Sequence, residues 1–166
     1  MKQSSDFIIR PARTSDATAI WRIIEPVIRA GETYALPREM TQTQAIAYWV
    51  GTDRETFVAE DNGRVVGTYY LRANQLGGGS HVANCGYIVA SDVAGRGFAR
   101  SMCEHSIELA KARGFRSMQF NLVVSTNERA VRLWQSLGFV TVGNLPGAFA
   151  HPHKGDVDAL VMFRKL

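Results

Sequence analysis

Two glycines flank an arginine in the stretch VAGRGFARSM, and a helical pattern of small and apolar residues begins directly after them. At a helix start, unpaired backbone N–H groups and the positive end of the helix dipole converge, and glycine lets a phosphate oxygen approach the chain closely. Gly95 and Gly97 therefore predict a seat for a pyrophosphate, to which Arg96 or Arg100 could add a charge-assisted contact. The alternative is a glycine-rich tight turn that only starts the helix.

The spacing of the glycines excludes two common classes of nucleotide site. A dinucleotide-binding domain has Gly-x-Gly-x-x-Gly after the first strand of a parallel sheet, whereas this loop lies in mid-chain and carries Arg100 in place of the third glycine. A P-loop needs Gly-Lys followed by Ser or Thr, and the sequence has no such triplet.

Gly86 and Asn121 each allow two interpretations, and Asn127 indicates the start of a helix. Gly86 interrupts a strand pattern, which indicates a bulge or a close approach of a neighbouring chain segment. Asn121 stands inside another strand pattern and could either tie two backbone segments together or orient a substrate. Asn127 precedes a helix and is suited to cap it. Arg129 and Arg132 of the same helix are predicted to be solvated surface charges, with contact to a bound phosphate as the less favoured alternative.

The histidines and cysteines do not have the spacing of a metal site. His151 and His153 are close together without a third ligand nearby, so a loop over a cleft is favoured over a metal site. Cys85 and Cys103 lie in different predicted elements and have no ligand partners at metal-site spacing. We therefore expect two free, buried thiols and no bound metal.

The elements that must position these residues alternate between the two hydrophobic periods. Helical spacing covers 14–32, where Pro26 is expected to kink or divide the helix, and then 41–51, 96–114 and 126–138. Strand patterns cover 7–13, 56–61, 64–73, 81–89, 116–124, 139–143 and 157–166, and Asn62-Gly63 marks a tight hairpin. The order predicts a mixed α/β (α+β) fold, with residues 1–166 forming one domain.

Composition limits the class of protein and its partners. Of the residues, 46% are hydrophobic, which is enough for one core, and the net charge of +4 comes from basic residues scattered among acids. This scatter argues against nucleic-acid binding. No apolar run approaches the roughly 20 residues of a membrane span, and no signal peptide is recognisable. The sequence therefore predicts a cytoplasmic protein with no membrane partner.

Two longer stretches carry a family resemblance. YIVASDVAGRGFARSMCEHSIELAKARGF followed by MQFNLVVSTNERAVRLWQSLGF closely resembles the GNAT superfamily of acetyl-CoA-dependent N-acetyltransferases. The matching motifs are the loop Gln/Arg-x-x-Gly-x-Gly/Ala and a later Asn-x-x-Ala/Ser helix that ends in Leu-Gly-Phe. The resemblance implies a mostly antiparallel central sheet flanked by helices, with a bulged fourth strand that splays from the fifth.

The resemblance also implies where acetyl-CoA would bind. Its pyrophosphate loop corresponds to Ala94, Gly95, Arg96, Gly97, Phe98 and Ala99, with Arg100 beside it. Ala94 stands where the family has Gln or Arg, so one side-chain contact is lost while the backbone cradle remains. By the same resemblance the pantetheine arm would lie along the backbone of Tyr87, Ile88 and Val89, near Asn127 and Trp134.

Two catalytic groups that are usual in the family are missing. The acceptor must react as a neutral amine, although an alkylammonium resembles lysine, with a pKa of about 10.4. Many members have a glutamate on the fourth strand to take the proton, and this strand has none, which leaves His81, Tyr87 or a water held by Asn84. Trp134 replaces the usual tyrosine acid, which predicts a modest loss of rate or another acid.

The acceptor is expected to be a small amine. In the superfamily the loop after the first helix covers the acceptor, which makes Glu32, Tyr34 and Arg38 candidates for reading the substrate together with Asn121. The stretch at 120–139 and the tail VDALVM resemble, more weakly, the branch that acetylates proline analogues. The alternatives are a peptide N-terminus as acceptor, or a non-catalytic acyl-CoA sensing domain. The resemblance also implies a homodimer.

Overall fold

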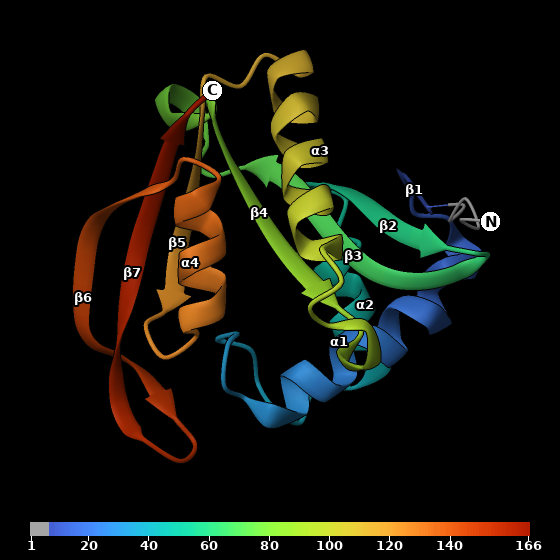
Figure 1. Cartoon of the computed structure of the whole chain (residues 1–166), viewed down its shortest axis with the longest axis horizontal. Coiled ribbons are helices and arrows are strands. Elements are labelled where there is room, and N and C mark those ends of the chain that lie inside the picture. Colours follow the sequence, from blue (N-terminus) through green and yellow to red (C-terminus); the bar gives the residue numbers. More distant parts are fainter. Residues whose placement is uncertain (1–6) are drawn as a thin grey trace.

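The computed structural model describes residues 7–166 and contains one seven-stranded sheet in the order β1-β2-β3-β4-β5-β7-β6 (Figure 1). The only parallel neighbours in it are β4 and β5. The strands are β1 (Phe7–Pro11), β2 (Glu55–Asp61), β3 (Arg64–Ala73), β4 (Val82–Val89), β5 (Ser117–Val124), β6 (Val140–His151) and β7 (Gly155–Lys165). This mixed, mostly antiparallel architecture confirms the predicted fold class.

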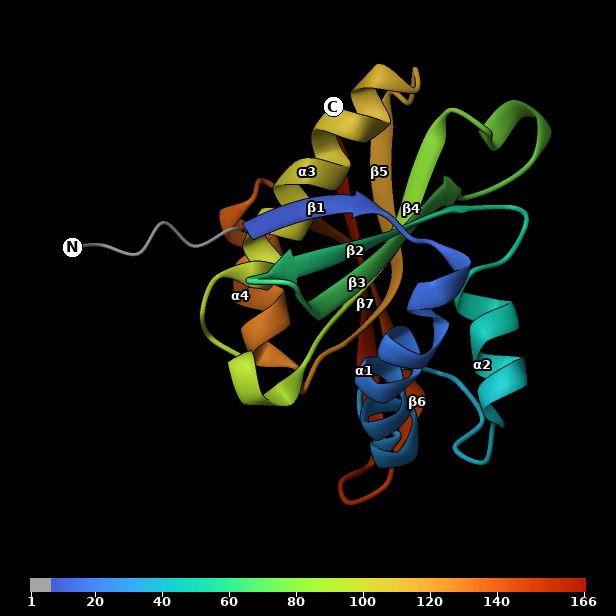
Figure 2. The same ribbon diagram turned by 90° about the vertical axis from the view of Figure 1, so that its right-hand side faces the viewer.

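Helices cover both faces of the sheet. Figure 2 shows α1 (Ala17–Ala30) and α2 (Gln42–Trp49) on one side, with α3 (Phe98–Ala112) and α4 (Glu128–Ser136) on the other. The buried Trp49 ties α2 to the sheet, since its indole donates to Thr68 Oγ1 at 2.9 Å. None of the helices between residues 7 and 166 combines the length and apolar composition of a membrane span.

Most helices and strands begin and end close to the positions predicted from the sequence, with two differences. Pro26 lies inside α1 but does not divide it into two helices. The strand predicted at 139–143 continues to His151, because its pairing with β7 resumes beyond irregularities between Thr141 and Gly143 and between Leu145 and Phe149. His151 and His153 therefore belong to the end and the turn of a long hairpin.

The strands β4 and β5 separate soon after they meet. Their pairing consists of Val82 with Ser117 and Ala83 with Met118, and it stops there. Beyond these pairs the two strands diverge, as Figure 1 shows below the C-terminal label. The splay that the resemblance implied is therefore present, and it leaves one edge of β4 without a strand partner.

Gly86 lies in a regular stretch of β4, so the bulge implied for this strand is wrong. The register between β3 and β4 runs without a shift from Gly67–Val89 to Ala73–Ala83. The second interpretation, a close approach, is the one observed. The position that a β-carbon would take at residue 86 lies 2.8 Å from Cε1 of Tyr70, the cross-strand partner. Only glycine leaves room for this ring.

Gly86→Ala is expected to lower the free energy of unfolding by about 1–3 kcal/mol, because the methyl group must displace a buried ring. Gly78→Ala is the control, since a β-carbon there meets nothing within 4 Å. Urea unfolding of both variants measures the difference. Equal stability of the two variants would show that the Tyr70 ring moves aside at no cost.

Both cysteines are free and buried, as predicted, and burial raises the pKa of each thiol to about 12. At pH 8 both are then neutral thiols, and thiolate is the form that reacts with aromatic disulfide reagents. We expect no fast reaction in the native protein and reaction of Cys85 and Cys103 after denaturation. Rapid labelling of native protein would contradict this burial.

Candidate functional site

Two cavities meet where β4 and β5 diverge. The first, called the cleft cavity, measures about 370 Å³ and lies between the two strands and the loop after α1. The second, called the loop cavity, measures about 410 Å³ and lies over the start of α3. Both are lined by Tyr87, Val89, Asn127, Ala130 and Trp134. These five residues form the junction through which the two cavities adjoin.

The loop cavity has the backbone form of an anion cradle. Gly95 and Gly97 have φ of 91° and 92°, values that favour glycine, and Gly97 is the N-cap of α3. A β-carbon at residue 97 would point into space free of other atoms within 4 Å. This room, the free N–H groups of the first helical turn and the helix dipole together fit a pyrophosphate. Except for Arg96, all residues from Ala94 to Arg100 line the cavity.

The arginines around this loop differ in their partners. Arg96 points to the buried carboxylate of Asp61, 3.2 Å away, and lies over the ring of Phe98. Arg100 donates to Ser136 Oγ at 2.7 Å but still lines the cavity. Arg96 is thus held outside the cavity that it was predicted to serve.

Arg129 reaches the loop from α4, which fits the less favoured alternative from the sequence, a contact to a bound phosphate. It lines the loop cavity, and its Nη2 lies 2.9 Å from the β-carbon position of Gly95. Arg132, on the same helix, pairs with Glu128 and does not line the cavity. Within residues 7–166 no ion pair or side-chain hydrogen bond is formed by Arg129. The two arginines look alike in the sequence, and only the packing of α4 against the loop distinguishes them.

The open edge of β4 presents the backbone of alternate residues to the gap. Ala90 N–H donates to Val66 O, and Asn74 N–H donates to Val82 O, so the even-numbered residues of β4 face β3. By antiparallel alternation, the N–H and C=O groups of Tyr87 and Val89 then face the gap. Ile88 is placed differently: its backbone faces its β3 partner Thr68, and the residue lines the cleft cavity.

The hydroxyl groups of Tyr34 and Tyr87 form hydrogen bonds within the protein. Tyr34 donates to the carbonyl oxygen of Tyr87 at 3.0 Å, which satisfies one group of the open edge. The Tyr87 hydroxyl lies 2.7 Å from Ser106 Oγ on α3. Burial raises the pKa of both phenols well above the ordinary value, so both are neutral near pH 7. In this geometry Tyr87 does not offer a proton-accepting group to the cleft.

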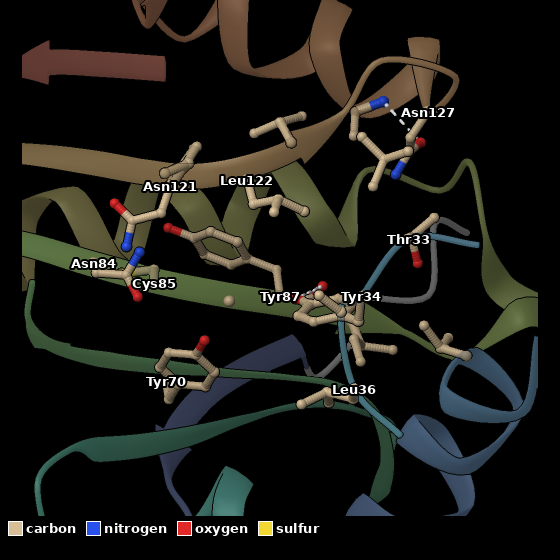
Figure 3. A pocket seen from close by; sticks show the side chains of 18 of the residues that line it. Thr33, Tyr34, Leu36, Tyr70, Asn84, Cys85, Tyr87, Asn121, Leu122 and Asn127 are labelled. Carbon is tan, nitrogen blue, oxygen red and sulfur yellow. Dashed lines mark hydrogen bonds between the residues drawn. The ribbon is translucent and has the colours of Figure 1, made fainter. Parts of the chain in front are cut away.

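Trp134 fills the junction from the α4 side. Its ring centroid lies 5.1 Å from that of Tyr87 and 5.2 Å from that of Phe120, and the residue is buried. Asn127 is the N-cap of α4, the helix that carries Trp134. Its Oδ1 accepts a hydrogen bond from Ala130 N–H at 3.4 Å (Figure 3). Its side chain also borders both cavities, so the capping role leaves the amide nitrogen available there.

Amides and phenols line the cleft cavity. Asn84 and Asn121 point toward one another from the two diverging strands, with Tyr70 and Tyr34 below them (Figure 3). The Asn84 amide donates to Gln119 O at 3.0 Å, and that of Asn121 donates to Asn74 Oδ1 at 2.7 Å. Asn121 thus bridges to the loop after β3 and borders the cavity as well. Among residues 7–166, no carboxylate or imidazole lines either cavity.

Besides Arg96, the predicted site residues His81, Glu32 and Arg38 lie outside both cavities. His81 precedes β4, and its carbonyl accepts from Arg116 N–H at 2.9 Å. Glu32 lies 3.9 Å from His153 Nε2, a contact between the loop after α1 and the β6–β7 turn. Arg72 is the reverse case: it lines the cleft cavity but was not singled out in the sequence. Residues i and i+2 of a strand share a face, so the spacing from Tyr70 could have indicated that Arg72 lies on the same side of β3.

Comparisons with known proteins agree with this geometry. Residues 19–139 match the model of the acetyltransferase (GNAT) family. N-acetyltransferase aca1 of Schizosaccharomyces pombe is 30% identical over 151 residues, which cover 81% of this chain and 72% of that protein. A GCN5-related N-acetyltransferase from Kribbella flavida is 43% identical, with a TM-score of 0.91 over 96% of this chain and 98% of that one.

A more distant structure with the same fold contains a bound cofactor. The yncA protein of Salmonella typhimurium, solved with its cofactor acetyl-CoA, is 22% identical, with a TM-score of 0.86 over 98% of this chain and 95% of that one. The family match, the relatives and the splayed sheet lead to one conclusion. The chain belongs to the GNAT family of acetyltransferases, enzymes that use acetyl-CoA.

Proposed function

We propose that this enzyme transfers the acetyl group of acetyl-CoA to the amine of a small molecule, with an amino acid or an analogue as the favoured acceptor. The observation that carries the proposal is the meeting of two cavities at one junction in the gap between β4 and β5. The loop cavity suits a phosphorylated cofactor. The cleft cavity has the volume of a small-molecule site, and its lining is polar enough to orient an amine.

In this proposal the two sides of the loop cavity bind the cofactor. The backbone of Ala94, Gly95 and Gly97 holds the pyrophosphate, and Arg129 supplies the positive charge from α4. The open edge of β4 at Tyr87 and Val89 pairs with the amide-containing arm, beside Asn127. When bound, acetyl-CoA supplies an activated acetyl thioester, whose carbonyl oxygen an edge N–H group stabilises as charge develops.

The residues of the junction include no carboxylate or imidazole, so proton transfer is left to water. The indole of Trp134 is not a practical acid, and a CoA thiol with a pKa near 8.5 can leave as thiolate near neutral pH. The neutral phenols of Tyr34 and Tyr87 do not accept the ammonium proton. A water molecule held near Asn84 then accepts the ammonium proton. The sequence left this water as an alternative to His81 and Tyr87.

The proposed enzyme is a homodimer that acts on free amines rather than on protein chains. Support for the dimer comes from the edge strand β6, on which Val140 and Val142 are 59% and 58% exposed. Release of free thiol from acetyl-CoA, measured over amino acids, alkyl amines and short peptides, tests the acceptor class. Transfer to peptides alone would show that the acceptor is a peptide N-terminus and not a small molecule. Binding of acetyl-CoA without transfer to any acceptor would contradict the proposal.

Gly97→Ala is expected to weaken acetyl-CoA binding by about tenfold or more, because the methyl group fills the space of a phosphate oxygen and disturbs its hydrogen bonds. Gly114→Ala is the matched control. Its φ of 84° imposes a similar strain at the opposite end of α3, again with nothing within 4 Å. Calorimetric titration measures both variants. A similar loss of affinity in both would attribute the effect to helix strain.

The rate is expected to follow the titration of the acceptor. Because only the neutral amine reacts and no carboxylate or imidazole lines the cavities in residues 7–166, log kcat/KM should rise with unit slope up to the pKa of the amine itself. Two acceptors whose amine pKa values differ by about two and a half units, such as an α-amino group and a lysine-type amine, should give profiles displaced by that amount. A common break point would indicate a titrating residue of the enzyme.

A further inference from the structure

Arg72 is the only charged residue that lines the cleft cavity in the part of the chain that the structure describes. It lies near the end of β3, opposite Asn84 of β4, on the face that also carries Tyr70. Its side chain is 29% exposed, so it is neither solvated like a surface arginine nor closed off from a ligand. The cavity therefore has one positive charge and no negative charge on its wall.

The protein neutralises this charge only in part. Arg72 Nη1 lies 3.4 Å from Asp53 Oδ2, and Nε lies 3.4 Å from Asn84 Oδ1, both at the long limit of a hydrogen bond. Asp53 is already held by Arg54, whose Nε and Nη2 donate to its two oxygens at 2.7 and 3.0 Å. One carboxylate thus faces two guanidinium groups, and the cluster has a net charge of +1.

Arg54 fixes this arrangement. Its guanidinium carbon lies 4.9 Å from the ring centroid of Tyr48 and 4.7 Å from that of Tyr70, and its side chain is only 7% exposed. Its hydrogen bonds lower the pKa of Asp53, which stays ionised near neutral pH. Because Asp53 is bound on the Arg54 side, it remains a distant partner of Arg72. The unused N–H groups of Arg72 are available to an oxyanion in the cavity.

We propose that Arg72 binds a carboxylate of the acceptor, so that this enzyme selects amines that carry a carboxylate over neutral amines. This inference rests on the proposed function and names its substrate class from the charge of the cavity. A simple ammonium ion gains nothing from a wall that is positive. An amino acid brings a negative group that a guanidinium can bind through two parallel hydrogen bonds.

The same charge also assists the loss of the ammonium proton. A positive group near an amine favours its neutral form, and water accepts the proton. One side chain would then both orient the carboxylate and favour the reactive form of the amine. In this proposal Arg72 is a substrate-binding residue that lies outside the junction.

The test compares acceptors in pairs that differ only in the carboxylate. Glycine, L-alanine, L-proline and L-methionine are each measured beside the corresponding carboxamide, with thiol release from acetyl-CoA as the readout and pH profiles that correct for amine pKa. The wild type is expected to prefer the acids by about 10- to 100-fold in kcat/KM, the effect of a charge-assisted pair. Arg72→Gln should reduce this ratio toward one through KM, without changing KM for acetyl-CoA.

Two variants separate the effect from structural change. Arg64→Gln alters an arginine of the same strand that is 57% exposed and pairs with Asp92 away from both cavities, so the ratio should not change. Arg72→Lys keeps the charge but not the two-pronged geometry and should be intermediate. Transfer without preference for the acids, or a preference that survives Arg72→Gln, would overturn the Arg72 proposal and leave the proposed function. No transfer to any amine would overturn both.

Discussion

The parting of β4 and β5 after two residue pairs is the constraint on which the rest of the structure depends. Backbone N–H and C=O groups inside a protein need partners, and an interrupted sheet leaves a row of them along one strand. Tyr34 satisfies one carbonyl from the loop after α1. The remaining groups at Tyr87 and Val89 border the junction of two cavities. An unfinished sheet edge thus becomes a place where an extended ligand can pair with the chain.

Aromatic packing maintains this gap. Trp134, Phe120 and Tyr87 contact one another beneath the junction, and Phe120 stacks on Phe139 with a centroid distance of 4.3 Å. These rings fill the space that a continuous sheet would have closed. On the opposite face Tyr70 lies across Gly86, which keeps the register of β3 and β4 regular while β5 departs. The gap is therefore a packed feature of the core.

The distribution of charge distinguishes the two cavities from the rest of the molecule. Several arginines elsewhere pair closely with acids, as Arg10 does with Asp16 and Arg113 with Glu55. Arg129 at the loop cavity forms no ion pair among residues 7–166, and Arg72 at the cleft cavity shares Asp53, 3.4 Å away, with Arg54. Both cavities are consequently suited to anionic groups. Composition alone could not indicate that these two positive charges lie at the cavities.

The sequence by itself determined the family and the element order and indicated a glycine loop suited to an anion. These depend on local patterns, namely Gly95 and Gly97 before a helix, Asn127 before the next, and Asn62-Gly63 between strands. Only the tertiary structure decided which side chains reach the cavities. It turned Arg96 toward Asp61, left Glu32 and His81 outside, and brought in Arg72 and Arg129. Those outcomes depend on contacts between residues distant in the chain, and a single sequence contains no periodicity that reports them.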